Sequence, residues 1–337
     1  MNIAVDAMGG DHAPGVTVQG ALWAQSEWGV NITLVGDQDL LGEQLRKRKK
    51  TGNGIQIHHC SQMVAMDESP LKVLRQKRDA SIVVAFDLVK RGKAEAVVSA
   101  GNSGATIGAA VLILGKIKGV ERPALAGIFP GAKGKVVLID VGANVETTPR
   151  QLFEFGIMGD VFTQSFLNID NPKVGILNIG EEGDKGNEQV RIAHDLFKQG
   201  PLNFVGNVEG RDIFSGDVQV IVSDGFVGNV AVKLSEGMAE TMGIMFEREM
   251  SHSLISRLGF WLGKRAFENF KRKLDYAEYG GALLLGVKGI GIICHGNSSP
   301  KAIKNAIRRA ADFVNNHVQD RLEQGLAKFQ SKGLQGD

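Results

Sequence analysis

The chain has 337 residues, which is enough for one large α/β domain or two lobes. Hydrophobic residues make up 43% and charged residues 23% of it, and the net charge of +2 gives no global electrostatic signal for nucleic acid. Cys60 and Cys294 lie far apart without a CxxC pair, so zinc and a disulfide framework are not indicated, which fits a reducing cytoplasm. No apolar stretch is long enough to span a bilayer, and the strand-like start predicts that no signal peptide is present.

Short β-branched runs alternate with helix-length amphipathic segments along the chain. The expected strands are residues 3–5, 32–35, 55–58, 96–98, 136–139, 174–177, 204–205, 220–222 and 290–293. The expected helices include residues 14–26, 37–50, 79–91, 149–164 and, as one long closing helix, 300–328. Residues 122–130 form an extended, proline-bounded piece whose pairing the pattern does not decide. The alternation predicts a parallel sheet covered on both faces, within a single α/β domain over residues 1–337.

Turns rich in glycine and asparagine follow five of these runs. Open α/β sheets bind ligands at the carboxyl ends of their parallel strands. Glycine lets backbone N–H groups approach an anion, and the helix that follows adds the positive end of its dipole. We therefore expect a site built from several strand ends around a phosphate-like group, formed by residues 6–12, 99–104, 140–144, 178–188 and 223–229.

Two of the turns have the features of a phosphate-binding site. In the first, Gly9 and Gly10 give a tight backbone, and they are followed by a titratable pair, Asp11 and His12. His12 could bind an anion or transfer a proton, or it could donate a hydrogen bond to a neighbouring loop. The second turn opens a helix and consists of Asn102, Ser103 and Gly104. Backbone N–H groups, a hydroxyl and the helix dipole can hold phosphate there, but Asn and Ser are also common helix caps.

Lys185 and Asn229 are the candidates for stabilising charge during a reaction. Lys185 stands in a glycine-flanked acidic loop, where an ammonium can hold phosphate or stabilise a developing oxyanion; a solvated loop charge is the ordinary alternative. Asn229 sits at a helix start, where its amide can donate to an oxyanion or cap the helix. Two asparagines of neighbouring turns, Asn144 and Asn187, are grouped with the phosphate-binding residues.

Several well-known motifs are missing from the sequence. None of the turns has GxGxxG spacing and there is no P-loop, so a nucleotide is not indicated. There is no GxSxG elbow, neither cysteine has a local histidine partner, and the carboxylates show no metal-ligand spacing. Phosphate-binding turns without a protein nucleophile or metal motif indicate direct attack by a bound small nucleophile, with catalysis from positioning and electrostatic stabilisation.

The segment over residues 254–273 mixes large apolar residues with cations. On a single helix its apolar residues fall on two faces, and a break near Gly259 or Gly263 would turn both faces the same way. We therefore expect an amphipathic helical pair that projects from the domain over residues 250–275. Trp and Phe beside Lys and Arg suit a membrane surface, whereas packing at a dimer interface is an equal alternative. The residues assigned to this surface are Leu258, Trp261, Leu262, Lys264, Arg265, Lys271 and Arg272.

From residue 2 to about residue 318, the turns and their flanks resemble the bacterial phosphate acyltransferases of phospholipid synthesis. The resemblance is carried by IAVDAMGGDHAP at residues 3–14, SAGNSGA at 99–105, ERPAL at 121–125, DVGAN at 140–144, GILNIGEE at 175–182, KGNE at 185–188, SDGFVGN at 223–229 and YGGALLLG at 279–286. It implies a three-layer α/β/α sandwich, similar to isopropylmalate dehydrogenases and phosphotransacetylases, that forms a homodimer without a cofactor or metal.

The resemblance also implies a reaction. A long fatty acyl group would pass from acyl carrier protein to inorganic phosphate, and a membrane glycerol-3-phosphate acyltransferase would consume the acyl phosphate. The family's catalytic pair falls on Lys185 and Asn229. Delivery of an apolar, water-labile product favours a cytoplasmic protein bound peripherally to the membrane, although the basic residues over 264–273 could receive the acidic carrier instead. The alternatives are a phosphotransacetylase-like enzyme that uses coenzyme A, and a non-catalytic membrane scaffold. A nicotinamide dehydrogenase is disfavoured by the missing metal-type acidic cluster.

Overall fold

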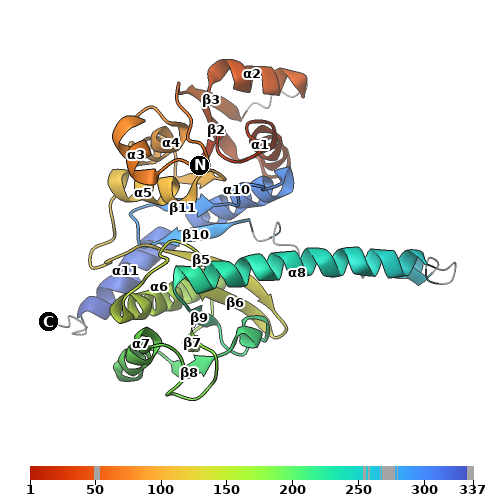
Figure 1. Ribbon diagram of the computed structural model, residues 1–337. Helices are drawn as coiled ribbons and strands as arrows, with labels where there is room; N and C mark the ends of the chain where they lie inside the picture. Colours follow the sequence, from red (N-terminus) through yellow and green to blue (C-terminus); the bar gives the residue numbers. More distant parts are fainter. Residues whose placement is uncertain are drawn as a thin grey trace.

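The computed structural model describes residues 1–48, 54–252, 256, 259–265, 267, 278 and 280–331 (Figure 1). Eleven strands within these residues form one mixed sheet in the order β3-β2-β1-β4-β11-β10-β5-β6-β9-β7-β8. The strands are β1 (Asn2–Asp6), β2 (Asn31–Gly36), β3 (Ile55–His59), β4 (Ala96–Ser99), β5 (Ala124–Gly131), β6 (Gly134–Ile139), β7 (Val174–Leu177), β8 (Phe204–Val208), β9 (Val220–Val222), β10 (Ala282–Leu285) and β11 (Ile290–Ile293).

The sheet consists of two parallel groups that run in opposite directions. The first group contains β1, β2, β3, β4 and β11, and the second contains β6, β7, β8 and β9. Between them, β10 pairs antiparallel with both β11 and β5, and β5 pairs antiparallel with β6. The expected parallel sheet is therefore wrong at its centre, because β5 and β6 form a hairpin, closed at Gly131 and Gly134, that reverses the chain.

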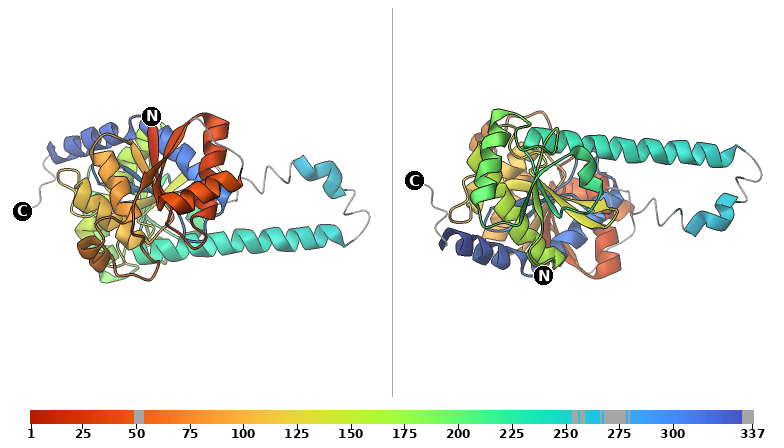
Figure 2. Two further views of the ribbon diagram at one scale, coloured as in Figure 1. Left: turned by 90° about the horizontal axis from the view of Figure 1, so that it is seen from above. Right: turned by 90° about the horizontal axis from the view of Figure 1, so that it is seen from below.

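Helices cover both faces of the sheet and make three layers (Figure 2). Ile3 and Val5 of β1 belong to one hydrophobic core, on the side of α1, α6 and α10, whereas Ala4 belongs to a second core on the side of α4 and α5. This alternation is what a strand buried on both faces requires. The helices are α1 (Gly15–Trp28), α2 (Gln38–Lys47), α3 (Pro70–Gln76), α4 (Ser81–Lys90), α5 (Ser103–Ile113), α6 (Pro149–Leu167), α7 (Glu188–Gln199), the 3-10 helix η1 (Gly210–Phe214), α8 (Gly225–Ser251), α10 (Pro300–Asn315) and α11 (Val318–Ser331).

Helix α8 extends away from the body of the molecule (Figures 1 and 2). Its 27 residues span about 40 Å, and its beginning packs against β6. Residues 259–265 are helical and lie near its far end, where the rings of Phe246 and Phe267 stack with centroids 4.3 Å apart. The helix runs through Gly263, so of the two expected break points only the one near Gly259 stays a prediction, because the residues just before Gly259 lie outside the described part of the chain.

The closing helix is divided in two. Residues 300–328 were expected to form one helix, but α10 ends at Asn315, and His317 has a φ of +51°, a left-handed conformation that ends a helix. The chain then changes direction, and α11 packs on α6 with Gly325 close against Val161. The expectation of one long helix is therefore wrong, because the break at His317 lets both halves bury their apolar faces.

Candidate active site

The turn after β1 packs tightly against the turn after β4. A side chain at Gly9 would collide with Asp6 Oδ2 and would come within 2.8 Å of the backbone nitrogen of Gly101. Gly10 has a φ of +112°, which residues with a side chain rarely adopt. The two predicted site residues that follow, Asp11 and His12, have exposed side chains. This turn therefore has the tight backbone expected of it, with its titratable pair open to solvent.

Asp6 lies beneath this turn; the sequence places it within the turn over residues 6–12 but does not single it out as a site residue. Its side chain is 3% exposed, and Oδ2 accepts a hydrogen bond from the hydroxyl of Ser99 at 2.7 Å. The same hydroxyl oxygen accepts from the N–H of Gly101 at 3.0 Å, while Asp6 Oδ1 is buried without a hydrogen-bond partner among the described residues. Burial raises the pKa of Asp6 above its ordinary value. A lone acid at the end of a buried strand was the signal that could have identified it.

Asn102 uses its whole side chain to hold two loops together. Nδ2 donates to the carbonyls of Met66 and Glu68 at 2.9 and 3.0 Å, and Oδ1 caps α5 by accepting from the N–H of Ala105 at 2.9 Å. The structure thus shows Asn102 as a helix cap. The next two predicted residues, Ser103 and Gly104, are exposed at the start of α5, where the helix dipole is positive.

The turn after β6 is built around the buried carboxylate of Asp140. Burial raises the pKa of Asp140, and hydrogen bonds to the carboxylate oppose that shift. Asn144 is 6% exposed and donates to Asp140 Oδ2 at 2.9 Å and to the carbonyl of Pro123 at 2.8 Å. Both hydrogens of its amide are therefore engaged, and Asn144 fixes the turn. The backbone N–H donors to Asp140, at 2.7–3.1 Å, belong to Leu125, Gly142, Ala143 and Asn144.

Asn229 is the fifth residue of α8 and lies directly over the turn after β6. A Cβ added at Gly142 would lie 3.5–3.8 Å from atoms of the Asn229 side chain. The helix is capped by Asp224, whose carboxylate accepts from the N–H of Val227 at 2.8 Å, so Asn229 is not the cap. Asn229 is half-buried, and its amide makes no hydrogen bond within the described part of the chain. This amide can therefore donate to a ligand at the turn.

The loop that carries Lys185 is shaped by Asn178. Nδ2 of Asn178 donates to the carbonyl of Lys185 at 3.0 Å, and Oδ1 accepts from the N–H of Ile179 at 2.8 Å. Gly186 has a φ of +89°, and a Cβ there would lie 2.5 Å from Asn178 Oδ1. The side chain of Lys185 is exposed. Lys185 is therefore presented to solvent on a loop whose backbone is held in place.

Helix α7 connects this loop to the turn after β6. Asn187 caps α7 by accepting an N–H of its first turn at 2.9 Å, and Gln189 Nε2 donates to Thr147 Oγ1. Strands β6, β9 and β7 are neighbours and run parallel, so their carboxyl ends share one edge of the sheet. The structure thus places Lys185 and Asn229 on neighbouring turns.

The two groups of turns are joined along α8. Because the strand groups run in opposite directions, the turns after β1 and β4 do not share an edge with those after β6, β7 and β9. Glu236 lies seven residues along α8 from Asn229, a rise of about 10 Å. Its Oε1 is 3.0 Å from Nε2 of His295 in the loop after β11, and the next residue, Gly296, accepts from the N–H of Asp11 at 2.8 Å. Helix α8 thus links the two groups of turns.

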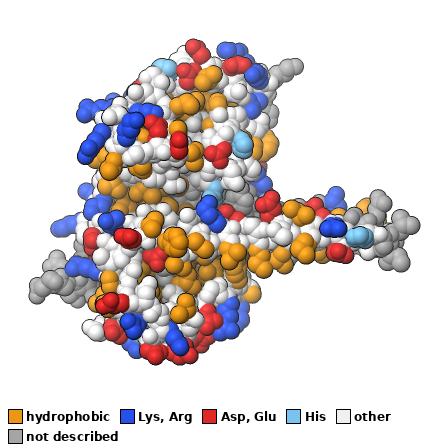
Figure 3. Space-filling view, in the orientation of Figure 1, with side chains coloured by type: hydrophobic (Ala, Val, Ile, Leu, Met, Phe, Trp, Pro, Cys, Tyr) orange, Lys and Arg blue, Asp and Glu red, His pale blue; other side chains and the backbone are white. Residues whose placement is uncertain are grey.

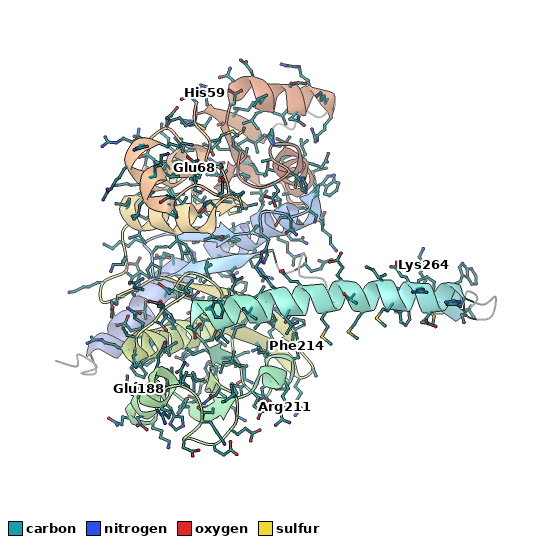
Figure 4. The ribbon with its side chains drawn as sticks, in the orientation of Figure 1. His59, Glu68, Glu188, Arg211, Phe214 and Lys264 are labelled. Carbon is teal, nitrogen blue, oxygen red and sulfur yellow. The ribbon has the colours of Figure 1, made fainter. Side chains whose placement is uncertain are left out.

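The aromatic and basic segment lies away from these turns, near the far end of α8, where Figure 4 labels Lys264. Trp261 and Leu262 are 70% and 72% exposed, and Arg265 is exposed too. Three other residues assigned to this surface, Leu258, Lys271 and Arg272, lie outside the described residues. No helix in the described part of the chain is long and apolar enough to cross a membrane.

Comparisons with known proteins assign the chain to a class. The model of the family described as fatty acid synthesis protein matches residues 1–321. The phosphate acyltransferase of Geobacter sulfurreducens is 52% identical over 326 residues, which cover 97% of this chain and 94% of the relative. That of Geotalea daltonii is 51% identical over 333 residues, or 98% and 96% of the two chains. A phosphotransacetylase from Streptococcus pyogenes shares the fold, with a TM-score of 0.62 at 17% identity over 95% of this chain and 94% of that one.

These matches define an α/β enzyme of the acyltransferase class. The chain belongs to the fatty acid synthesis protein family, among relatives named phosphate acyltransferase. The family resemblance and the α/β sandwich expected from the sequence are confirmed.

Proposed function

We propose that the enzyme transfers a long-chain fatty acyl group from acyl carrier protein to inorganic phosphate. The product is acyl phosphate, which a membrane glycerol-3-phosphate acyltransferase consumes in phospholipid synthesis. Support comes from the family, from the relatives named phosphate acyltransferase and from a fold shared with a phosphotransacetylase. The sequence relatives are named phosphate acyltransferases and the structural neighbour is a phosphotransacetylase, and both names favour phosphate as the acyl acceptor.

The observation that carries the proposal is the unengaged amide of Asn229, next to the Gly142 turn and on a turn neighbouring that of Lys185. A phosphate oxygen attacks the thioester carbonyl carbon and forms a tetrahedral oxyanion, to which Lys185 and Asn229 donate. The carbon–sulfur bond then breaks and the carrier leaves as a thiolate. The turn at Gly9 and Gly10 and the start of α5, predicted to bind phosphate, hold it in place. Because this phosphate is the attacking group, no protein nucleophile is needed.

Apolar side chains beside these donors favour a long acyl chain over an acetyl group. Val145, Ile179 and Phe226 are 65%, 83% and 61% exposed, and each stands on one of the turns after β6, β7 and β9. The N–H of the residue before Phe226 donates to the carbonyl of Asn144 at 2.7 Å, which joins two of these turns. Covering such side chains with an acyl chain removes apolar surface from water.

We also propose that the enzyme forms a homodimer and binds to the surface of the cytoplasmic membrane. Exposed apolar residues recur about every four positions along α8 and form a stripe suited to a second copy of the chain, which supports a homodimer. Exposed Trp261 and Leu262, beside Lys264 and Arg265, support peripheral binding to the cytoplasmic membrane. The members of the α8 stripe are Val230, Leu234, Met238, Met242 and Met245.

The test is phosphate-dependent release of the carrier thiol from a long-chain acyl carrier protein. We expect turnover by the native enzyme and a fall in kcat of about 100-fold or more in Lys185→Ala and Asn229→Ala at saturating phosphate. Lys198→Ala, which removes an exposed lysine at the other end of α7, is the matched control and should keep full activity. Full turnover by Lys185→Ala would remove Lys185 from the mechanism. A preference for acyl-coenzyme A would favour the phosphotransacetylase-like alternative, and no turnover with either donor would favour a scaffold.

A further inference from the structure

Basic and apolar side chains are exposed together around α3. Lys72 and Arg75 are one turn apart on this helix, and Arg78 follows its end; all three are exposed, without a carboxylate at salt-bridge distance among the described residues. In Figure 3, Lys and Arg side chains gather over this part of the upper half. Exposed apolar residues stand beside them, with Leu71 at 68%, Met63 at 53% and Met66 at 41%. We call these six residues the α3 patch.

Most of the nearby acidic charge is already engaged. Glu68 pairs with Lys77 at 2.7 Å, and the Lys77 ammonium lowers the pKa of Glu68. Asp79 accepts hydrogen bonds from the N–H and the hydroxyl of Ser61. Asp67 remains as an exposed acid at the border of the patch. The α3 patch therefore presents cations that are free to pair with an acidic partner.

The α3 patch adjoins the candidate active site. Asn102 donates to the carbonyls of Met66 and Glu68, and a Cβ at Gly104 would lie 2.6 Å from Cγ of Pro70, the first residue of α3. The patch is thus fixed to the turn proposed to hold phosphate.

The basic residues near the far end of α8 are much more distant from the site. Phe267 of that segment packs on Phe246, which is 17 residues along α8 from Asn229, a rise of about 25 Å. A carrier bound there would have to deliver its thioester over that distance. A carrier at the α3 patch borders the turn after β4, which is proposed to hold phosphate.

We propose that the α3 patch is the docking surface for an acidic carrier protein that bears the acyl thioester. This inference rests on the proposed function, in which the donor is such a carrier. Complementary charge would speed the encounter and fix the orientation of the carrier, while Leu71, Met63 and Met66 supply the apolar contact. The cations near the far end of α8 are then left for the anionic headgroups of a membrane.

The experiment measures the KM for a long-chain acyl carrier protein and, separately, the Kd for the carrier without its acyl group. In Lys72→Glu/Arg75→Glu we expect both to rise about tenfold or more at low salt, and much less at high salt, with the KM for phosphate unchanged. Leu71→Ser, which leaves the charge unaltered, should raise both at either salt concentration. Lys90→Glu/Lys93→Glu is the matched control, because it reverses two exposed lysines just before β4, at the opposite end of that strand from Asn102.

A third double variant, Lys264→Glu/Arg265→Glu, tests the other basic surface. Weaker carrier binding in this variant, with unchanged binding in Lys72→Glu/Arg75→Glu, would overturn the proposal. It would also be overturned if neither variant weakened binding. Because the Kd needs no turnover, carrier binding at α3 can be measured even if phosphate-dependent thiol release fails, so failure of the docking surface and failure of the proposed function give different results.

Discussion

Three buried aspartates illustrate how environment decides the role of a single residue. Asp140 accepts hydrogen bonds from four backbone N–H groups and one amide, so its carboxylate organises an entire turn. Asp6 joins two strand ends through the hydroxyl of Ser99. Asp160, inside α6, has the side-chain amide of Gln164 as its partner at 2.7 Å. Asp160 therefore bears the cost of burial with little compensation.

Asp160 should make the protein less stable as the pH rises. Burial raises its pKa from 3.8 to about 6, so the folded chain holds this proton more tightly than the unfolded chain. The stabilisation of the folded chain by this tighter proton binding is complete below about pH 4 and is lost as the pH rises through about 6. In Asp160→Asn, we expect the free energy of unfolding at pH 8 to exceed that of the native protein by roughly 1–3 kcal/mol. Denaturant titrations at pH 4 and pH 8 measure this, and an equal difference at both pH values would contradict it.

At the scale of elements, the loop between β7 and α7 depends on one glycine. Gly186 combines a φ of +89° with the close approach to Asn178 Oδ1, the amide that also holds the carbonyl of Lys185. A methyl group there must either strain the backbone or displace Asn178. The position of Lys185 is therefore set by the shape of the loop as well as by the strand before it.

Gly186→Ala should lower kcat by about tenfold or more, because small displacements of a charge-stabilising group weaken transition-state binding. The KM for the carrier should change little, since the loop follows β7, whereas the α3 patch contacts the turn after β4 in the other strand group. Gly92→Ala is the matched control: its φ is +67°, but a Cβ there meets nothing within 4 Å, and it lies in the turn before β4. Thiol-release kinetics and thermal unfolding of both variants give the result. Equal losses of activity in both would mean that general destabilisation, rather than loop shape, is responsible.

The sequence predicted the elements better than their assembly. Apolar runs located nine of the strands, because a buried strand leaves a local pattern, and the edge strands β3 and β8 keep enough apolar residues to show it although they are only partly buried. The direction of the second strand group depends on the β5–β6 hairpin, whose proline-containing first strand gave no clear pairing signal. Turn composition likewise placed Asn102 and Asn144 at strand ends. Whether their amides face a ligand depends on Met66 and Pro123, which are 36 and 21 residues away and have no signature in the turns themselves.

At the scale of the whole molecule, α8 connects the candidate active site to the surfaces proposed for dimerisation and membrane binding. Asn229 lies near its beginning, two turns later Glu236 meets His295 of the other strand group, and its far end meets the segment with Trp261. Figure 3 shows apolar side chains along the lower side of this helix. If a second copy of the chain covered that stripe, the far ends of both α8 helices would stay exposed and available for a membrane.

Membrane binding should depend on the apolar side chains exposed near that far end. In Trp261→Glu/Leu262→Glu, two carboxylates replace side chains that are 70% and 72% exposed, so insertion into the acyl boundary becomes unfavourable and anionic headgroups repel the new charges. We expect co-sedimentation with anionic phospholipid vesicles to fall at least tenfold, while thiol release in solution stays unchanged. Trp23→Glu, which replaces a tryptophan 42% exposed on α1, should sediment like the native protein. Unaltered sedimentation of the double variant would reject the membrane role. The aromatic residues of the Trp261 segment would then be assigned to an interface between copies of the chain.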